Sequence, residues 1–346
     1  MISFYISGHG FGHASRSIEL IRALIRKQPD VRVTVKTTAP PWLFESMSEV
    51  TYERLEGDTG LTQTDSVTID VADSAARAAR FYRDFERRAD SEAARLRSAR
   101  AELVIGDIPP LAHAAAARAG LPSVAVSNFT WDWIYETYET FERDAPGVIQ
   151  TIRDAYRLCT LAMRLPMHGG FSSMSQITDI PFIARRSRRA RSDTRRIAGI
   201  PDDRPFVLAS FSGYGLSVPF EQIAEHEHVT IFSSPTAPPP PLAYEDLVAA
   251  ADLVISKPGY GIVSECIANG TPLLYTSRGR FAEYDVFVRE MPRMLSCRFI
   301  PPQDLRSGSW RPHIDALLAQ SAPHERPRVD GAEVAADLIV RTRTRT

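Results

Sequence analysis

Two histidines stand within a glycine-rich segment near the start of the chain. His9 and His13 alternate with Gly8, Gly10 and Gly12, directly after a short apolar run. Glycine lets a backbone approach a ligand closely, and N–H groups at the start of a helix face an anion favourably. Histidine is the side chain best able to accept a hydroxyl proton near pH 7. We therefore predict an anion site with a general base beside it.

Two common nucleotide-binding loops do not fit this segment. A dinucleotide-binding loop needs a third glycine where this chain has His13, and an acidic residue at the end of the next strand, where Thr37, Thr38 and Ala39 stand instead. A Walker loop needs a Lys-Ser or Lys-Thr pair after its glycines, and none follows here. The segment therefore favours neither a nicotinamide cofactor nor a Walker-type nucleotide site.

A second glycine turn occurs in the later half of the chain. The strand-like run 253–256 leads into Gly259, Tyr260 and Gly261, and Glu265 follows about one helical turn further on. Such a turn can hold phosphate at the start of a helix. The glycines could also serve only as a tight strand-to-helix turn, and Glu265 could simply complement the helix dipole.

Strand-like and helix-like runs alternate along the chain. In the first half the strand-like runs are 2–6, 31–35, 103–105 and 123–126, and the helix-like runs are 72–100 and 111–119. In the second half the strand-like runs are 206–211, 229–232 and 253–256. This alternation is typical of βαβ units in a parallel sheet. Because 346 residues exceed what one hydrophobic core usually organises, we predict two α/β domains with a ligand cleft between them.

The domain boundaries follow from changes in composition. We place an amino-terminal domain at 1–184, an arginine-rich linker at 185–204 and a second domain at 205–329, with a last helix at about 330–346 that can pack back on the first domain. Seven arginines fall within residues 185–196. The overall net charge is only −1 and no aromatic residues interleave with these arginines, so we interpret the segment as a solvated linker and expect no nucleic-acid partner.

The composition is ordinary for a soluble globular protein, with 44% hydrophobic residues. The apolar start reaches Gly8 after a few residues, which is too short for the core of a signal peptide. No later stretch approaches the roughly 20 apolar residues of a membrane span. We therefore expect a cytoplasmic protein without an integral membrane segment.

In its two glycine turns the chain resembles the GT-B glycosyltransferases, and the resemblance extends over essentially its whole length. Gly8–His13 is similar to the amino-terminal loop of MurG-like enzymes, and Lys257–Pro272 is similar to the donor-nucleotide segment of the UDP-glycosyltransferase superfamily. Gly8–His13, Asn128–Asp132 and Gly259–Gly261 also resemble the glycosyltransferase-like amino-terminal region of plant L-arabinokinases. The family implies an α/β GT-B fold, in which two Rossmann-like parallel-sheet domains face each other across a cleft.

The resemblance further implies transfer of a sugar from a nucleotide-diphosphate sugar, with a UDP-sugar as the expected donor, to a small acceptor that the sequence does not identify. For the donor nucleotide and its phosphates, the resemblance implies contacts with Ser210, Ser212, Gly213, Lys257, Gly259, Tyr260, Gly261 and Glu265. For the donor sugar, it implies contacts with Glu283 and Asp285. On the acceptor side, it implies Gly10, Phe11, Gly12, Asn128 and Trp131.

We assign His13 as the base that deprotonates the acceptor. Asp107 follows the strand-like run 103–105 and would orient the imidazole and stabilise its protonated form. Asp107 could instead cap the helix that comes after it. His9 and Trp131 could likewise be core residues rather than ligand contacts.

The sequence contains no Asp-x-Asp pair, the usual arrangement for holding a divalent ion against a diphosphate. Helix N-termini can stabilise departing phosphates without a metal, so we expect neither a metal ion nor a cofactor. Two other classes of protein remain open. A nucleotide-sugar epimerase or hydrolase could use the same cleft, and a non-catalytic module could bind nucleotide sugar without turning it over.

Overall fold

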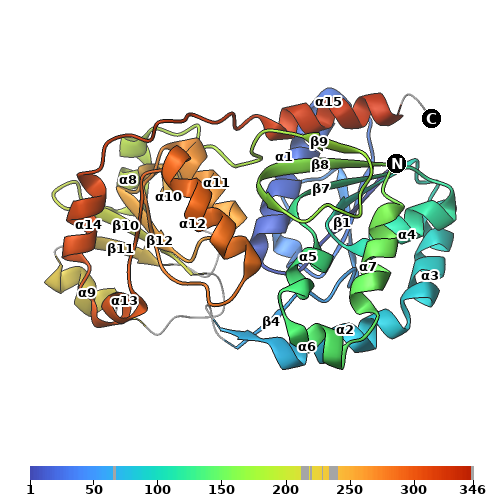
Figure 1. Cartoon of the computed structure of the whole chain (residues 1–346). Helices are drawn as coiled ribbons and strands as arrows, with labels where there is room; N and C mark the ends of the chain where they lie inside the picture. The colour runs from blue at the N-terminus through green and yellow to red at the C-terminus, as the bar shows by residue number, and fades with distance from the viewer. Residues whose placement is uncertain (65–67, 212–217, 219, 228, 234–240, 344–346) are drawn as a thin grey trace.

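The chain folds into two α/β halves, each built on its own parallel sheet (Figure 1). The computed structural model describes residues 1–64, 68–211, 218, 220–227, 229–233 and 241–343. Every described pairing within the two large sheets is parallel. The α/β fold class predicted from the sequence is therefore confirmed.

The sheet of the first half has the strand order β3-β2-β1-β6-β7-β8-β9. Strands β1, β2, β6 and β7 are buried along their whole length, as expected for parallel strands that are covered on both faces. The strands of this sheet are β1 (Ile2–Ile6), β2 (Val33–Thr37), β3 (Val50–Arg54), β6 (Leu103–Asp107), β7 (Ser123–Phe129), β8 (Leu161–Gly169) and β9 (Ile177–Asp179).

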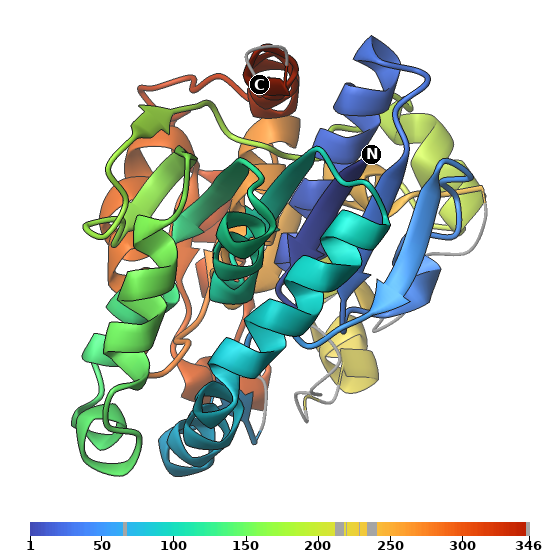
Figure 2. The ribbon, with the colours of Figure 1, turned by 90° about the vertical axis from the view of Figure 1, so that its right-hand side faces the viewer.

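Helices cover both faces of this sheet (Figure 2). The predicted helix 72–100 is interrupted at Asp84, so that two helices form instead of one. The helices of the first half are α1 (Phe11–Lys27), the short η1 (Pro41–Leu43), α2 (Val71–Arg83), α3 (Phe85–Ser98), α4 (Pro110–Ala119), α5 (Trp131–Glu136), α6 (Glu139–Asp144) and α7 (Val148–Arg157), and a two-stranded hairpin pairs β4 (Thr62–Gln63) with β5 (Ile69–Asp70).

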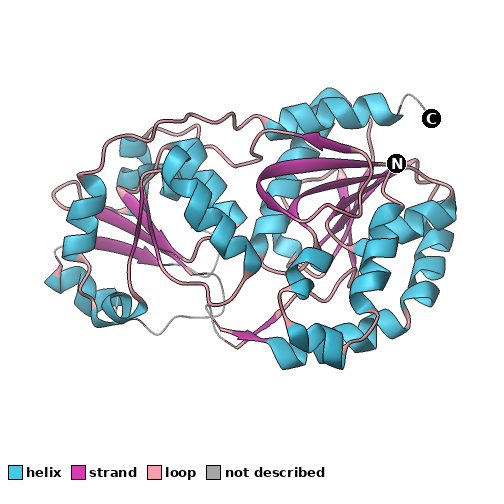
Figure 3. Cartoon of the chain, in the orientation of Figure 1, coloured by secondary structure: helices cyan, strands magenta, loops and turns pink. Residues whose placement is uncertain are grey.

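The sheet of the second half has the strand order β11-β10-β12-β13-β14. Figure 3 shows strands of this sheet in magenta with helices in cyan around them. Its strands are β10 (Phe206–Ser210), β11 (Thr230–Ser233), β12 (Leu253–Ser256), β13 (Leu273–Tyr275) and β14 (Cys297–Phe299), and its helices are α8 (Arg191–Ala198), α9 (Phe220–His226), α10 (Tyr244–Ala250), α11 (Tyr260–Asn269), α12 (Ala282–Met294), α13 (Pro302–Ser307) and α14 (Arg311–Leu318). In the described part of the chain, no helix combines the length and the apolarity needed to cross a bilayer.

The last helix, α15 (Gly331–Arg343), returns to the first half and lies along α1 (Figure 1). Its Ala335 and Ile339 side chains are fully buried in the core. Lys27 of α1 places its Nζ 2.9 Å from an Asp337 carboxylate oxygen of α15. The end of the chain therefore belongs structurally to the first half.

The arginine-rich segment between the halves is partly packed against the second half and partly exposed to solvent. It contains α8, and its arginines meet carboxylates of the second half. Arg189 Nε lies 3.4 Å from Asp246 Oδ2, and Arg195 Nη2 lies 2.6 Å from Asp252 Oδ2. The prediction of a solvated linker therefore fits Arg186, Arg188, Arg191 and Arg196, which are exposed, but does not fit Arg195, which is buried.

Candidate active site

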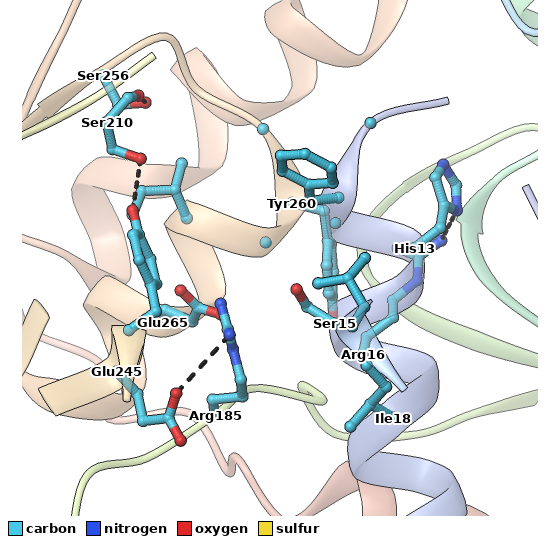
Figure 4. A pocket seen from close by; sticks show the side chains of 18 of the residues that line it. His13, Ser15, Arg16, Ile18, Arg185, Ser210, Glu245, Ser256, Tyr260 and Glu265 are labelled. Atoms are coloured by element: carbon cyan, nitrogen blue, oxygen red, sulfur yellow. Dashed lines mark hydrogen bonds and ion pairs between the residues drawn. The ribbon is translucent and has the colours of Figure 1, made fainter. Parts of the chain in front are cut away.

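A cavity of about 620 Å³ lies where the two halves meet, and residues from both halves line it (Figure 4). Among the residues predicted from the sequence, Asp107, Trp131 and Asp285 do not line this cavity. Ser212 and Gly213 lie outside the described residues. The predicted residues that do line it are Gly10, Phe11, Gly12, His13, Asn128, Ser210, Lys257, Gly259, Tyr260, Gly261, Glu265 and Glu283.

Two helices begin at this cavity, one from each half. Helix α1 starts after Gly10, whose φ of 79° is in the left-handed region that suits glycine, and α11 starts after Gly259. Neither glycine supplies a side-chain cap, so the first-turn N–H groups are not satisfied in that way. Both helix starts carry partial positive charge, and together they favour an anion such as a diphosphate.

The two glycine turns touch each other across the boundary between the halves. A Cβ atom added at Gly261 would lie 3.2 Å from the Cα of Gly12. A Cβ atom added at Gly12 would lie 3.6 Å from the backbone nitrogen of Gly261, which is an ordinary van der Waals distance. The close approach therefore depends more strongly on the glycine at position 261.

We expect Gly261→Ala to weaken nucleotide binding more than Gly12→Ala does. A Cβ atom at position 261 forces one of the two glycine turns to move away from the other. Overpacking of this kind destabilises the folded arrangement by about 1–3 kcal/mol. Calorimetric titration of both variants with the same nucleoside diphosphate checks this expectation. Equal affinities in the two variants would contradict it.

His13 lies at the end of the first turn with its Nδ1 2.8 Å from Asp107 Oδ1. Arg16 Nη2 is also 2.9 Å from this nitrogen. An ionised Asp107 can only accept, so Nδ1 donates to it, while Arg16 has other acceptors in Asp107, Ser127 and Asn128. This tautomer leaves a lone pair on Nε2, to which no residue in the described part of the chain hydrogen-bonds. The ring can therefore take a proton from a ligand in the cavity.

Asp107 is buried behind His13 and held by Arg16. Arg16 donates from Nε to Oδ2 at 2.7 Å and from Nη2 to Oδ1 at 2.5 Å. Burial alone would raise the pKa of this carboxyl, but the charges of Arg16 and His13 lower it to about 2. Asp107 is thus ionised at neutral pH and can stabilise an imidazolium at His13. Helix α4 has Pro109 as its N-cap and no side-chain cap, so the alternative that Asp107 caps this helix is wrong.

Arg16 extends this network into the second half. Its Nη1 donates to Asn128 Oδ1 at 2.7 Å, and Asn128 Nδ2 donates to Glu283 Oε1 at 2.7 Å. Arg278 Nη1 donates to the other oxygen of Glu283 at 2.6 Å. The Arg16 guanidinium carbon also lies 4.9 Å from the centre of the Tyr260 ring. A continuous chain of polar contacts therefore joins the His13–Asp107 pair to Glu283.

Glu265 lies on the second-half wall and is almost fully buried. Arg185 places both Nε and Nη2 2.6 Å from its Oε1 (Figure 4). Burial raises the pKa of Glu265, and the charge of Arg185 partly offsets this. No residue in the described ranges hydrogen-bonds its Oε2, so this oxygen can accept hydrogen bonds from a ligand.

Ser210 and Lys257 lie at the carboxyl ends of the neighbouring strands β10 and β12. The Ser210 hydroxyl oxygen is 2.5 Å from the Tyr244 hydroxyl oxygen. Lys257 Nζ donates to Gln63 Oε1 at 3.3 Å, which is a contact between the halves. Both residues line the cavity beside the α11 helix start, where the lysine adds positive charge.

Solved structures with the same arrangement of two halves are glycosyltransferases. CalG4, the calicheamicin glycosyltransferase, matches with a TM-score of 0.63 and 16% identity, covering 100% of this chain and 98% of that one. The glycosyltransferase of kitacinnamycin matches with a TM-score of 0.60 and 17% identity, covering 98% of each chain. MurG of Acinetobacter baumannii matches with a TM-score of 0.53 and 13% identity, covering 100% of this chain and 99% of that one. The chain has the GT-B fold.

The chain also has a longer sequence relative. The chain is 31% identical to L-arabinokinase of Arabidopsis thaliana over an alignment 375 positions long, which covers 99% of this chain and 34% of that protein. The chain thus spans about a third of the length of this relative. No protein-family model matches the chain.

Within this GT-B fold, Trp131 is packed in the core of the first half. Its side chain is 0% exposed, and its Nε1 donates to Asp58 Oδ2 at 3.0 Å. Ser7 donates to the other oxygen of Asp58 at 3.0 Å. The structure therefore does not bring Trp131 to the cavity, and Asp285 lies exposed on α12.

His9 lines the cavity of this GT-B fold but is a poor base. The backbone N–H of Leu61 donates to its Nδ1 at 3.4 Å, and its ring stacks against Phe281. Burial and then the charge of Arg278 lower the pKa of His9 to about 3. His9 is therefore a weak proton acceptor, and the contact with Asp107 favours His13 as the candidate base.

The sequence analysis did not identify Arg16, Arg185 and Arg278. Arg16 lies three residues after His13, so the two side chains share a face of α1, and its position within an amphipathic run was the available signal. Arg185 lies in the segment interpreted as a solvated linker. Arg278 has no local sequence signal, because only the fold shows that it pairs with Glu283 in the first turn of α12.

Proposed function

We propose that this protein is a glycosyltransferase that moves a sugar from a nucleotide-diphosphate sugar to a hydroxyl group of a small acceptor. One observation carries the proposal: His13, held from behind by Asp107, lines the same cavity as the α11 helix start and Glu265. A base on one wall and an anion-binding helix start on the other suit transfer from a diphosphate leaving group. The GT-B fold supports the same conclusion.

The second half holds the donor in this proposal. The diphosphate lies against the first-turn N–H groups of α11, and Lys257 adds a positive charge beside it. Glu265 accepts hydrogen bonds from the ribose hydroxyls through Oε2, because Oε1 is engaged by Arg185. Glu283, which Asn128 and Arg278 hold in place, contacts the donor sugar.

The reaction is a displacement at the anomeric carbon of the donor sugar. The acceptor oxygen forms a bond to this carbon, while the bond from the carbon to the β-phosphate oxygen breaks. His13 Nε2 takes the hydroxyl proton, and Asp107 stabilises the resulting imidazolium. The departing nucleoside diphosphate keeps the bonding electrons, and the two helix starts stabilise its added negative charge.

Release of nucleoside diphosphate tests this proposal. The protein is incubated with UDP-, GDP-, ADP- or dTDP-sugars, with and without a mixture of small hydroxylated acceptors. Acceptor-dependent release supports a glycosyltransferase, with UDP favoured by the sequence resemblance alone. Equal release without acceptor indicates a hydrolase, and conversion of the donor sugar without release indicates an epimerase. Binding without any turnover indicates a non-catalytic module.

We expect the transfer to be independent of divalent metal ions. The helix starts and Lys257 supply positive charge at the diphosphate position. Among the described residues, no group of three or more His, Cys, Asp or Glu side chains is arranged to hold a metal ion. Activity should therefore be unchanged by EDTA. Complete loss on chelation, restored by magnesium or manganese, would contradict the metal-free mechanism.

A further inference from the structure

Glu245 is a cavity-lining carboxylate without a hydrogen-bond donor among the described residues. It lies in the first turn of α10, and its side chain is only 17% exposed. The cation next to it is Arg185, whose Nη1 is 3.7 Å from Glu245 Oε2, beyond hydrogen-bonding distance. An ionised carboxylate only accepts hydrogen bonds, so a Glu245 that lines the cavity without a protein donor can receive N–H or O–H groups of a ligand.

Glu245 stands beyond the ribose position in the order in which a nucleotide would lie. Arg185 is placed between Glu265 and Glu245 and approaches both carboxylates (Figure 4). In the proposed function, on which this inference rests, the phosphates lie at the α11 start and the ribose at Glu265. The next part of the nucleotide is the base, and Glu245 lies where its edge would be read.

Apolar side chains line the same cavity as Glu245, and such walls suit a flat aromatic base. Leu242, three residues before Glu245, and Ile262 of α11 line it from the second half. Ile18 of α1 lines it from the first half, opposite Glu245 (Figure 4). Apolar walls with one polar group at the edge are typical of small-molecule sites, in which the polar group provides specificity.

We propose that the donor carries guanine and that Glu245 selects it. A carboxylate only accepts hydrogen bonds, and guanine presents N1–H and the 2-amino group side by side, so both carboxylate oxygens receive a donor. Uracil presents a single N–H between two carbonyl oxygens, which repel a carboxylate. Adenine presents its amino group beside the lone pair of N1. The structure thus favours a GDP-sugar over the UDP-sugar that the family resemblance implies.

Calorimetric titration of the whole protein with GDP, IDP, UDP and ADP tests the proposal. Hydrogen bonds to a charged group are strong, so GDP should bind on the order of tenfold to a hundredfold more tightly than UDP or ADP. IDP lacks the 2-amino group and should fall between GDP and UDP. UDP or ADP binding as tightly as GDP would overturn the guanine assignment. Failure of all four to bind would instead overturn the proposed function itself.

Glu245→Gln provides the second arm of the test. Glutamine offers one acceptor and one donor, so GDP should lose at least about tenfold in affinity, while UDP should keep or gain affinity. Glu139→Gln, at an exposed position on α6, is the matched control and should change neither. Equal weakening of all four nucleotides would place Glu245 at the ribose and overturn the proposal. The comparison of nucleotides on the unaltered protein remains decisive if the variant does not fold.

Discussion

Replacing His13 with alanine should slow sugar transfer by roughly 10²–10⁴-fold, which is the usual contribution of a general base. His13 presents an unengaged Nε2 to the cavity, and its Nδ1 is held by Asp107 at 2.8 Å. Nucleoside diphosphate affinity should stay unchanged, because His13→Ala keeps the backbone N–H groups of the α1 start and does not alter the second-half wall of the donor site. Steady-state kinetics together with calorimetric titration of the same variant measure both quantities.

His168→Ala is the matched control, since His168 is exposed on β8 and does not line the cavity. It should leave both turnover and affinity unchanged. Near-normal turnover in His13→Ala would remove His13 as the base. Loss of nucleotide affinity together with turnover would show that His13 serves the donor site rather than the acceptor.

Replacing Arg16 with methionine should destabilise the fold by about 3–5 kcal/mol at pH 7, because it leaves Asp107 as a buried, uncompensated charge. In the unaltered protein the pKa of Asp107 is held near 2, below its ordinary 3.8. Ionised Asp107 therefore contributes about 2 kcal/mol of stability above pH 4, and this is lost as the pH falls toward 2. Without Arg16, burial raises this pKa instead. The difference in unfolding free energy between the unaltered protein and Arg16→Met should then shrink as the pH is lowered from 7 to 4.5.

Denaturant unfolding at these two pH values measures the effect of Arg16→Met. The double variant Arg16→Met, Asp107→Asn should recover much of the lost stability, since no buried charge remains. Arg22→Met is the control on the same helix: Arg22 is 40% exposed and pairs with Glu19, so at most about 1 kcal/mol should be lost. A deficit in Arg16→Met that is equal at pH 7 and 4.5, and that Asp107→Asn does not relieve, would contradict this account.

The sequence analysis predicted β1, β2, β6, β7, β10, β11 and β12, but it missed β3, β8, β9, β13 and β14. Strands buried on both faces leave continuous apolar runs, whereas β3, β9 and β14 are partly or largely exposed and leave none. The continuous apolar runs at Ile2–Ile6 and Leu253–Ser256 form β1 and β12 within those limits. The break at Asp84 carries no glycine or proline, so the division into α2 and α3 could not be read from local signals. The packing of the arginine-rich segment depends on Asp246 and Asp252, which only the fold brings near it.

The candidate site was predictable where the backbone itself forms it. Glycines leave a sequence signal, and the turns around Gly12 and Gly261 lie together at the cavity. Charged side chains gave weaker signals, because their roles depend on distant partners. Arg16 meets Asp107 from 91 residues away, and Arg185 meets Glu265 from 80 residues away. Glu245 had no local signal, since the cavity that encloses it is formed by both halves.

Thermal unfolding in the presence of nucleoside diphosphates tests most directly whether the cavity between the halves is a donor site. A ligand at about 100 times its dissociation constant stabilises the folded state by about 2.7 kcal/mol, which raises the melting temperature measurably. We predict such a rise for the unaltered protein and a much smaller one for Glu265→Ala, which removes the proposed ribose contact. Absence of a rise with GDP, UDP, ADP and dTDP alike, or an equal rise in Glu265→Ala, would contradict the account.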